Sequence, residues 1–295
     1  MEKKGTILGV DLGGTKTALG LYDFATLKRL EEKILPTNAE RGYAAVAKNL
    51  VEEIRAMKTD DTIAIGLGVP GLIDAKSGRI LTMPNIPGSE NTDIKSEIET
   101  HTGLKVNLEN DASCFAYAEA KLGAGKGRAI VIGITLGTGV GGGIVIDGKL
   151  FRGAHGYAGE LGHMLLKPGD PPFDTRNLRG EVEQFLSGTA LRNRCPKAKT
   201  PRDYLEGDAC AGLRGQMIRE IAWLVSSLTH SIDPSIIVFG GSVGRALKPH
   251  LNELRDVLKK WLLTGYPLPE VTCGILDDSA RRGACLLARE SLKQA

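Results

Sequence analysis

The stretch DLGGTKT, residues 11–17, combines residue types that a turn alone does not require. It joins two apolar runs typical of strands, TILGV before it and ALGLY after it. A hairpin needs glycine only where φ is positive or where another group approaches the main chain closely. Asp11 and Lys16 go beyond that need, because a carboxylate beside N–H groups and hydroxyls suits a phosphate with its divalent cation. Taken alone, these residues leave a tight turn and a phosphate site equally open.

A second glycine-rich stretch aligns with the first without a gap. Residues 131–147 match residues 7–23, with Gly137 falling on Gly13 and apolar positions agreeing through both strands. This repeat predicts two similar domains, each opening with a glycine hairpin. The second hairpin contains GTGVGG, which satisfies G-x-G-x-x-G, but the strand-like GIVIDGKLF follows where a dinucleotide fold requires a helix. We therefore predict a strand–turn–strand phosphate clamp there.

Asp111 lies between a predicted strand and a predicted helix in LENDASCFAYAEA. An aspartate at that place is commonly a helix N-cap. It is also a candidate general base, which would accept a hydroxyl proton as that oxygen attacks phosphorus. Asn110 and Asn85 would then be hydrogen-bonding neighbours, although asparagine is also an ordinary turn residue.

A carboxylate and an imidazole stand three residues apart in HGYAGELGHM, residues 155–164. On one helical turn Glu160 and His163 would share a face. Together they offer the acceptors and donors that recognise sugar hydroxyls. A structural role is the alternative for both.

The composition is that of an ordinary soluble globular protein. At 295 residues the chain suggests about two domains, and 42% hydrophobic against 25% charged residues gives a real core. No run approaches the ~18 apolar residues of a membrane span, and MEKKGTILGVD lacks a signal pattern, so we expect a cytoplasmic protein without a membrane partner. The net charge of +3 is spread along the chain, which gives no support to nucleic-acid binding.

The cysteines are odd in number, scattered and without a CxxC pair. This pattern predicts reduced, buried thiols, with neither a disulfide framework nor a zinc knuckle. The five are Cys114, Cys195, Cys210, Cys273 and Cys285.

Strands that alternate with helices predict α/β layers. We place the domain boundary in LGAGKGR, which gives a small α/β domain over residues 1–120 and a larger one over residues 121–278. A terminal helix over residues 279–295 is expected to pack back on the first domain. Two such domains would leave a cleft for a nucleotide and a second substrate. Strands are predicted near 5–11, 15–23 and 28–35, and in TIAIGLGVPG, LKVNLEN, AIVIGITLG and SIIVFGG. Helices are predicted near 41–58, in DIKSEIETHTG, after Ala112, and near 187–194, 210–232 and 245–263.

Seven ordered motifs resemble the ROK family of bacterial sugar kinases over essentially the whole chain. They are DLGGTK (11–16), GLGVPG (66–71), ENDA (109–112), LGTGVGGG (136–143), AGELGH (158–163), VEQFLSG (182–188) and DPSIIVFGG (233–241). The resemblance implies the actin-like, ribonuclease-H-like fold with two α/β domains, and ATP-dependent phosphorylation of a sugar.

The resemblance also implies a role for each matching position. Asp111 would be the general base, and Asp11 would act near the Mg²⁺ ion and its waters. The sugar ligands would be Asn85, Asn110, Glu160, His163 and Glu183, with Gly68 lining the same pocket. The phosphate clamps would be Gly13, Gly14, Thr15, Lys16, Gly137, Thr138 and Gly139, and the adenosine loop Gly240 and Gly241.

One motif of the family is missing. Many members carry Cys-x-Cys-Gly-x-x-Gly-Cys before the glutamate that Glu183 matches, and it binds zinc together with the histidine that His163 matches. This chain has DTRNLRGE at residues 174–181, with Asp174, Arg176 and Glu181 in place of three thiolates. Because zinc ligands are neutral or anionic donors, a guanidinium there predicts that no structural zinc is bound. We expect Arg176 to pair with Asp174 or Glu181 instead.

The spacing around IDGKLFRGAHGYAGELGHM is most similar to bacterial glucokinases, so glucose is the first candidate substrate and ATP the donor. Kinases of N-acetylglucosamine, N-acetylmannosamine and fructose share nearly all these motifs, and polyphosphate remains an alternative donor. A sugar-sensing DNA-binding regulator is the rival class, but only ten residues precede Asp11, too few for a helix-turn-helix domain. A catalytically inert binding module is the third possibility. The resemblance implies a homodimer.

Overall fold

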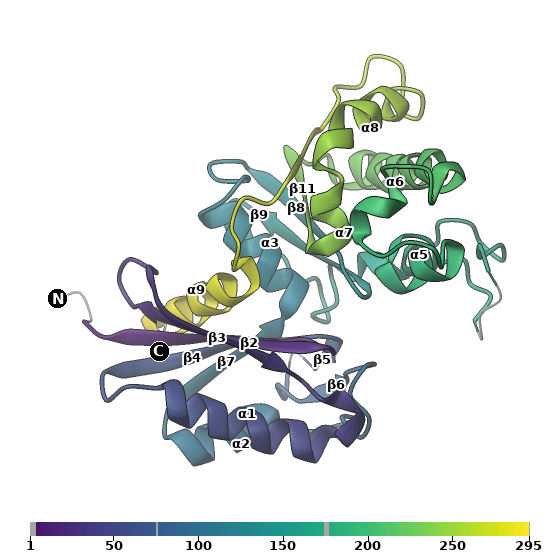
Figure 1. Cartoon of the computed structure of the whole chain (residues 1–295). Helices are drawn as coiled ribbons and strands as arrows, with labels where there is room; N and C mark the ends of the chain where they lie inside the picture. The colour runs from purple at the N-terminus through teal and green to yellow at the C-terminus, as the bar shows by residue number, and fades with distance from the viewer. Residues whose placement is uncertain (1–3, 75, 174–176, 295) are drawn as a thin grey trace. The chain divides into compact units, whose positions relative to one another are not determined.

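The computed structural model describes residues 4–74, 76–173 and 177–294. The chain divides into two compact units, each assembled from more than one stretch of sequence. Each unit contains one five-stranded sheet, and Figure 1 labels the elements where there is room. Unit 1 consists of Met1–Ala118, Arg152–Ala158 and Asp277–Ala295, and unit 2 of Glu119–Phe151 and Gly159–Leu276.

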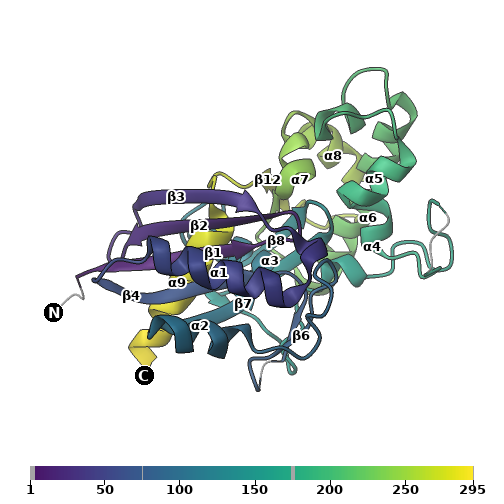
Figure 2. The ribbon, with the colours of Figure 1, turned by 60° about the horizontal axis from the view of Figure 1, so that its bottom comes forward.

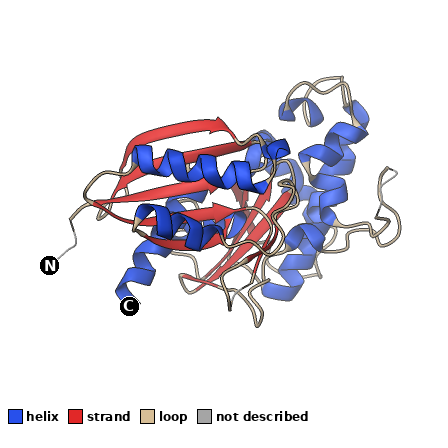
Figure 3. Ribbon diagram, turned by 90° about the horizontal axis from the view of Figure 1, so that it is seen from below, coloured by secondary structure: helices blue, strands red, loops and turns tan. Residues whose placement is uncertain are grey.

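Unit 1 is a sheet of order β3-β2-β1-β4-β7 covered by helices on both faces. Helices α1 and α2 lie across one face and α9 lies on the other, as Figures 2 and 3 show. The strands are β1 (Thr6–Leu12), β2 (Lys16–Asp23), β3 (Arg29–Pro36), β4 (Thr62–Val69) and β7 (Lys105–Asn110), with a small hairpin of β5 (Leu72–Ile73) and β6 (Ile80–Thr82). The helices are α1 (Tyr43–Met57), α2 (Ile94–Thr102) and α9 (Ser279–Gln294).

Helix α9 packs closely on the sheet and on the helix that begins at Asp111, because three contact positions have no side chain. A Cβ at Gly66 in β4 would lie 2.2 Å from the carbonyl oxygen of Ala284, and one at Gly9 in β1 2.7 Å from that of Arg281. Gly283 of α9 approaches the carbonyl of Cys114 in the same way. Interiors are packed too densely to absorb such overlaps, so these glycines permit the terminal helix to lie against β1 and β4.

Unit 2 repeats the same sheet plan, with the order β10-β9-β8-β11-β12. Its largest helix, α6, supplies much of a core that also includes the inner faces of β8, β9 and β11. The strands are β8 (Ile130–Leu136), β9 (Val140–Ile146), β10 (Lys149–Leu150), β11 (Ile236–Gly240) and β12 (Glu270–Cys273). The helices are α4 (Val182–Leu186), α5 (Gly188–Arg194), α6 (Ala211–Ile232), α7 (Gly241–Ala246) and α8 (Leu251–Leu258), and α3 (Asp111–Lys121) runs from unit 1 into unit 2.

The two glycine hairpins occupy equivalent places in these sheets, as the sequence repeat predicts. In each sheet the hairpin strands, β1–β2 and β8–β9, are antiparallel, and the first strand of each pair is parallel to its other neighbour. The strand β9 follows GTGVGG directly, which confirms that this loop does not open a dinucleotide-binding helix.

One predicted helix is wrong in its extent. The segment near 245–263 is not a single helix but α7, a 3₁₀ turn over Lys248–His250, and α8. Pro249 lies in that turn, where its missing N–H and its ring prevent a continuous α-helix. In the described part of the chain no helix is both long and apolar enough to cross a membrane.

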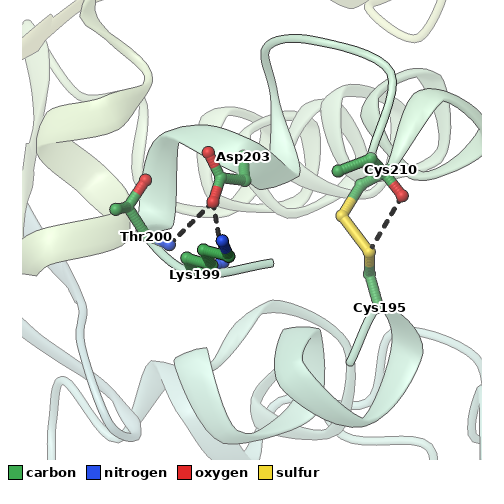
Figure 4. Close-up of a disulfide and its surroundings, with 6 residues drawn as sticks. Cys195, Lys199, Thr200, Asp203 and Cys210 are labelled. Carbon is green, nitrogen blue, oxygen red and sulfur yellow. Dashed lines mark hydrogen bonds between the residues drawn. A yellow bond between two sulfur atoms is a disulfide. The ribbon is translucent and has the colours of Figure 1, made fainter. Parts of the chain in front are cut away.

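The cysteine prediction is wrong for one pair. Cys195 and Cys210 form a disulfide with an S–S distance of 2.02 Å, joining the end of α5 to the start of α6 (Figure 4). The intervening loop turns back on itself, with Asp203 accepting hydrogen bonds from the backbone N–H groups of Lys199 and Thr200 at 2.7 and 2.8 Å. Spacing could not reveal this pair because the fold of the loop brings the two thiols together. Cys114, Cys273 and Cys285 are free and buried, as expected.

Candidate active site

Polar residues gather where the parallel strands of unit 1 end. The strand register places Asp11 of β1 beside Gly68 of β4, and Val69 of β4 beside Asn110 of β7. Asp111 follows Asn110 directly and begins α3. A Cβ on Gly68 would lie 3.5 Å from the Cα of Asp111, so the backbone of β4 lies close to the start of α3 at this edge. Carboxyl ends of parallel strands are the usual ligand sites of α/β folds.

Asn110, more than Asp111, carries the capping role that the sequence left open. Its Oδ1 accepts hydrogen bonds from the backbone N–H groups of Ala112 and Ser113, both at 3.0 Å, and its Nδ2 donates to the carbonyl of Gly71 at 3.2 Å. One carboxylate oxygen of Asp111 accepts from Ala112 at 2.8 Å. The helix start is therefore satisfied largely by the asparagine.

The first glycine hairpin turns tightly and packs against Asn85. The N–H of Gly13 donates to the carbonyl of Lys16 at 3.0 Å, which closes the turn. A Cβ at Gly14 would lie 2.6 Å from the Cβ of Asn85, so this loop and that asparagine are in direct contact. Thr15 and Lys16 are exposed at the tip. The stretch therefore forms a tight turn, one of the two possibilities that the sequence left open, and Thr15 and Lys16 face solvent.

The carboxyl group of Asp11 is influenced both by burial and by two positive charges. Burial raises the pKa of its carboxyl, while the positive charges of Lys16 and Arg281 lower it. Desolvation that disfavours a negative charge would be relieved by a bound cation. Among the described residues, no three His, Cys, Asp or Glu side chains form a metal cluster.

In unit 2 the second glycine hairpin and the β11–α7 loop lie side by side. Gly137 at the end of β8 accepts a hydrogen bond from the N–H of Gly188 at 2.7 Å. Gly241 has φ +75°, and a Cβ there would lie 2.2 Å from the carbonyl oxygen of Leu136. The expected phosphate residues Gly137, Thr138 and Gly139 thus lie next to the expected adenosine loop of Gly240 and Gly241.

The three expected sugar ligands of unit 2 also lie near one another. Burial raises the pKa of Glu160, His163 lowers it, and the negative charge of Glu183 raises it further. An oxygen of Glu183 accepts a hydrogen bond from the N–H of Val140 at 2.8 Å, which ties α4 to the hairpin strand β9. Two carboxylates and an imidazole at this spacing can recognise several hydroxyl groups at once.

Sequence reasoning missed the residues that hold His163. Its Nδ1 lies 3.2 Å from Oε2 of Glu181, and the other oxygen of Glu181 accepts from Arg179 at 2.9 Å. We expected Arg176 to pair with Asp174 or Glu181, but Asp174 and Arg176 lie outside the described residues. The described residues show that Glu181 pairs with Arg179, another arginine of the same DTRNLRGE segment.

The sequence model of the ROK family matches residues 7–291. The chain belongs to the ROK family. This confirms the resemblance carried by its seven motifs.

Three similar proteins place this ROK chain among sugar kinases and their relatives. A glucokinase from Thermotoga maritima is 30% identical over 314 residues, covering 97% of this chain and 98% of that protein. An N-acetyl-D-glucosamine kinase from Vibrio cholerae is 38% identical over 301 residues, covering 95% and 98%. The crystal structure of a ROK glucokinase from Streptomyces griseus, in complex with glucose and AMPPNP, has a TM-score of 0.80 at 32% identity, covering 97% of this chain and all of that one. The ROK chain accordingly has the actin-like, ribonuclease-H-like fold that the resemblance implies.

Proposed function

We propose that this ROK protein is an ATP-dependent hexose kinase that transfers the γ-phosphate of ATP to the 6-hydroxyl of the sugar. The observation that carries the proposal is the edge of the unit 1 sheet, where Asp11, Gly68, Asn110 and Asp111 meet. Phosphoryl transfer needs positioning, charge neutralisation and one base, and this edge offers residues for each.

Asp111 is the general base of the proposed reaction. Asn110 supplies two of the hydrogen bonds that cap the start of α3. Capping therefore need not be the main role of the Asp111 carboxylate. It accepts the proton of the sugar hydroxyl as that oxygen forms a bond to the γ-phosphorus and the bond to the β–γ bridging oxygen breaks. Asn85 and Asn110 bind the sugar beside it, and Gly68 lines the same pocket.

Glu160, His163 and Glu183 are the remaining sugar ligands of the proposal, as the family resemblance implies. The phosphates are bound by backbone N–H groups of Gly13, Gly14, Gly137 and Gly139 and by the side chains of Thr15, Lys16 and Thr138. Gly240 and Gly241 allow the adenosine to approach the main chain. Magnesium, held through water by Asp11, would neutralise charge on the transferred phosphate.

Glucose is the first candidate substrate, because the glucokinases of Thermotoga maritima and Streptomyces griseus match nearly the whole chain. An N-acetylhexosamine is the second, because the N-acetyl-D-glucosamine kinase of Vibrio cholerae shares more identity, 38% against 30%. The two differ by one acetamido group, and its acceptance depends on pocket shape. We place the reaction in the cytoplasm, as the sequence patterns suggest, and we expect a homodimer, as the family resemblance implies.

A coupled ADP-release assay tests this proposal. Purified protein with Mg-ATP is offered glucose, mannose, fructose, N-acetylglucosamine and N-acetylmannosamine, and polyphosphate replaces ATP in a parallel series. We expect sugar-dependent ADP release with the highest kcat/KM for glucose. Release with none of these sugars would refute the kinase proposal, and a preference for N-acetylglucosamine would support the second candidate.

A further inference from the structure

Glu181 is a buried carboxylate that touches one of the proposed sugar ligands without being one itself. It is 5% exposed, whereas the side chain of His163 is 57% exposed. Its Oε2 lies 3.2 Å from Nδ1 of His163, and its Oε1 accepts from Nη1 of Arg179 at 2.9 Å. The imidazole is therefore held from its buried side, and the rest of its ring faces outward.

The backbone around Glu181 pairs with the segment that follows His163. The N–H of Val182 donates to the carbonyl of Met164 at 2.8 Å, and the N–H of Leu166 donates to the carbonyl of Gly180 at 2.8 Å. The segment after His163 and the segment containing Glu181 thus form a short antiparallel ladder. The side chain of Gln184 accepts from the N–H of Glu181 at 3.0 Å.

Glu181 also begins the helix that carries another proposed ligand. It is the N-cap of α4, and Glu183 is the second residue of that helix. Glu160 lies just before the 3₁₀ turn Leu161–His163 on the other side of the ladder. One carboxylate accordingly connects the turn that presents Glu160 and His163 with the helix that presents Glu183.

The charge at Glu181 has a direct chemical consequence for the imidazole. Burial on its own would raise the pKa of Glu181, but hydrogen bonds from Arg179 and His163 lower it, so the group is a carboxylate. A carboxylate accepts and cannot donate, so Nδ1 of His163 must carry a proton. In the neutral ring Nε2 is then an acceptor, because a partner on one ring nitrogen sets the tautomer of the other.

We propose that Glu181 is a positioning residue for sugar recognition, which holds the Nδ1–H tautomer of His163 so that Nε2 accepts a hydrogen bond from a sugar hydroxyl. This inference rests on the proposed function for the identity of the ligand. Arg179, with a side chain 68% exposed, neutralises the second oxygen of Glu181 and keeps the buried carboxylate paired.

The tautomer can be measured in the wild-type protein without any sugar. In protein labelled with ¹⁵N and ¹³C histidine at pH ~8.5, about two units above the usual imidazole pKa, the ring nitrogens report which one is protonated. The chain has five histidines, and the signal lost in His163→Ala identifies the one of interest. We expect Nδ1–H for His163. An Nε2–H tautomer would overturn the proposal, whatever reaction the protein catalyses.

The kinetic test uses Glu181→Gln, because an amide can donate as well as accept and no longer holds one tautomer. We expect the sugar KM to rise about tenfold, the effect of losing one hydrogen bond to a charged group, with kcat and the KM for ATP nearly unchanged. Glu253→Gln is the matched control, since Glu253 is also in unit 2 and ion-paired, with Arg214 at 2.8 Å. An unchanged sugar KM in Glu181→Gln would overturn the proposal.

A double-mutant cycle separates positioning from simple stabilisation of the loop. If Glu181 acts through His163, Glu181→Gln adds no further rise in sugar KM when His163 is already alanine. A full additional rise in that background would mean that Glu181 acts through another group, and the proposal would fail. Should Glu181→Gln not fold, the wild-type tautomer still decides the question.

Discussion

The carboxylate of Glu183 and the backbone N–H of Val140 are joined by a hydrogen bond of 2.8 Å. It links helix α4 to the first residue of β9, directly after the loop Gly137–Gly139. A residue proposed to bind sugar is thereby oriented by the loop proposed to bind phosphate. The close approach depends on Gly139, where a Cβ would lie 2.5 Å from Oε2 of Glu183.

Gly139→Ala is therefore expected to displace the Glu183 carboxylate, because that flexible side chain yields more readily than the backbone. Loss of the bond to Val140 should raise the sugar KM about tenfold. Gly215→Ala in α6 is the control, since Gly215 also lies in unit 2, a Cβ there meets nothing within 4 Å, and the sugar KM should stay unchanged. Steady-state kinetics on both variants measure this, and equal sugar KM values for the two would contradict the role given to Gly139.

Asp111→Asn should lower kcat by about 10²–10⁴, the usual contribution of a general base. The asparagine keeps an oxygen that accepts from Ala112, and Asn110 still caps α3, so the thermal unfolding midpoint should hardly change. Sugar affinity, measured by calorimetry, should also stay close to wild type, because a base acts mainly in the transition state. A wild-type kcat would remove Asp111 as the base.

The free energy of unfolding of Glu160→Gln is expected to differ from that of the wild type in a way that depends on pH. Burial raises the pKa of its carboxyl above the ordinary 4.5, so the folded protein binds this proton more tightly than the unfolded chain. The contribution of this group is fully present below pH 4.5 and is lost as pH rises through the higher folded pKa. Glu160→Gln should thus have a larger free energy of unfolding than wild type at neutral pH, with the difference shrinking in acid, and a weaker affinity for sugar. Denaturant titrations at several pH values check this, and a destabilised variant at neutral pH would contradict it.

The Cys195–Cys210 disulfide should stabilise unit 2 against unfolding. It closes a loop with a sequence separation of 15, for which the chain-entropy model gives about 3 kcal/mol. Replacing both cysteines by alanine, or adding reductant to the wild type, should lower the free energy of unfolding by a similar amount. Both tryptophans, Trp223 and Trp261, lie in unit 2 and report its unfolding by fluorescence. Reductant should have no effect on the double variant, and a reductant-insensitive wild type would argue against the bond.

Residues close in the chain were the ones that sequence reasoning could place. The hairpins at DLGGTKT and LGTGVGGG were predictable because a turn and its two strands are specified within about fifteen residues, and the repeat showed that both halves share a plan. The same holds for Asp111, whose place between a strand and a helix is a local property. Helix α1 followed from the spacing of its apolar residues.

By itself, the sequence determined the alternation of strands and helices, the paired hairpins, the family and the set of polar residues available for chemistry. Only the tertiary structure decided which residues are in contact. Glu181 contacts His163 and Arg179, Cys195 is bonded to Cys210, and α9 packs against Gly66, which has no Cβ. The physical reason is that propensities and turn chemistry act over neighbouring residues. Hydrogen bonds, ion pairs and packing act over a few ångströms in space, whatever the separation along the chain.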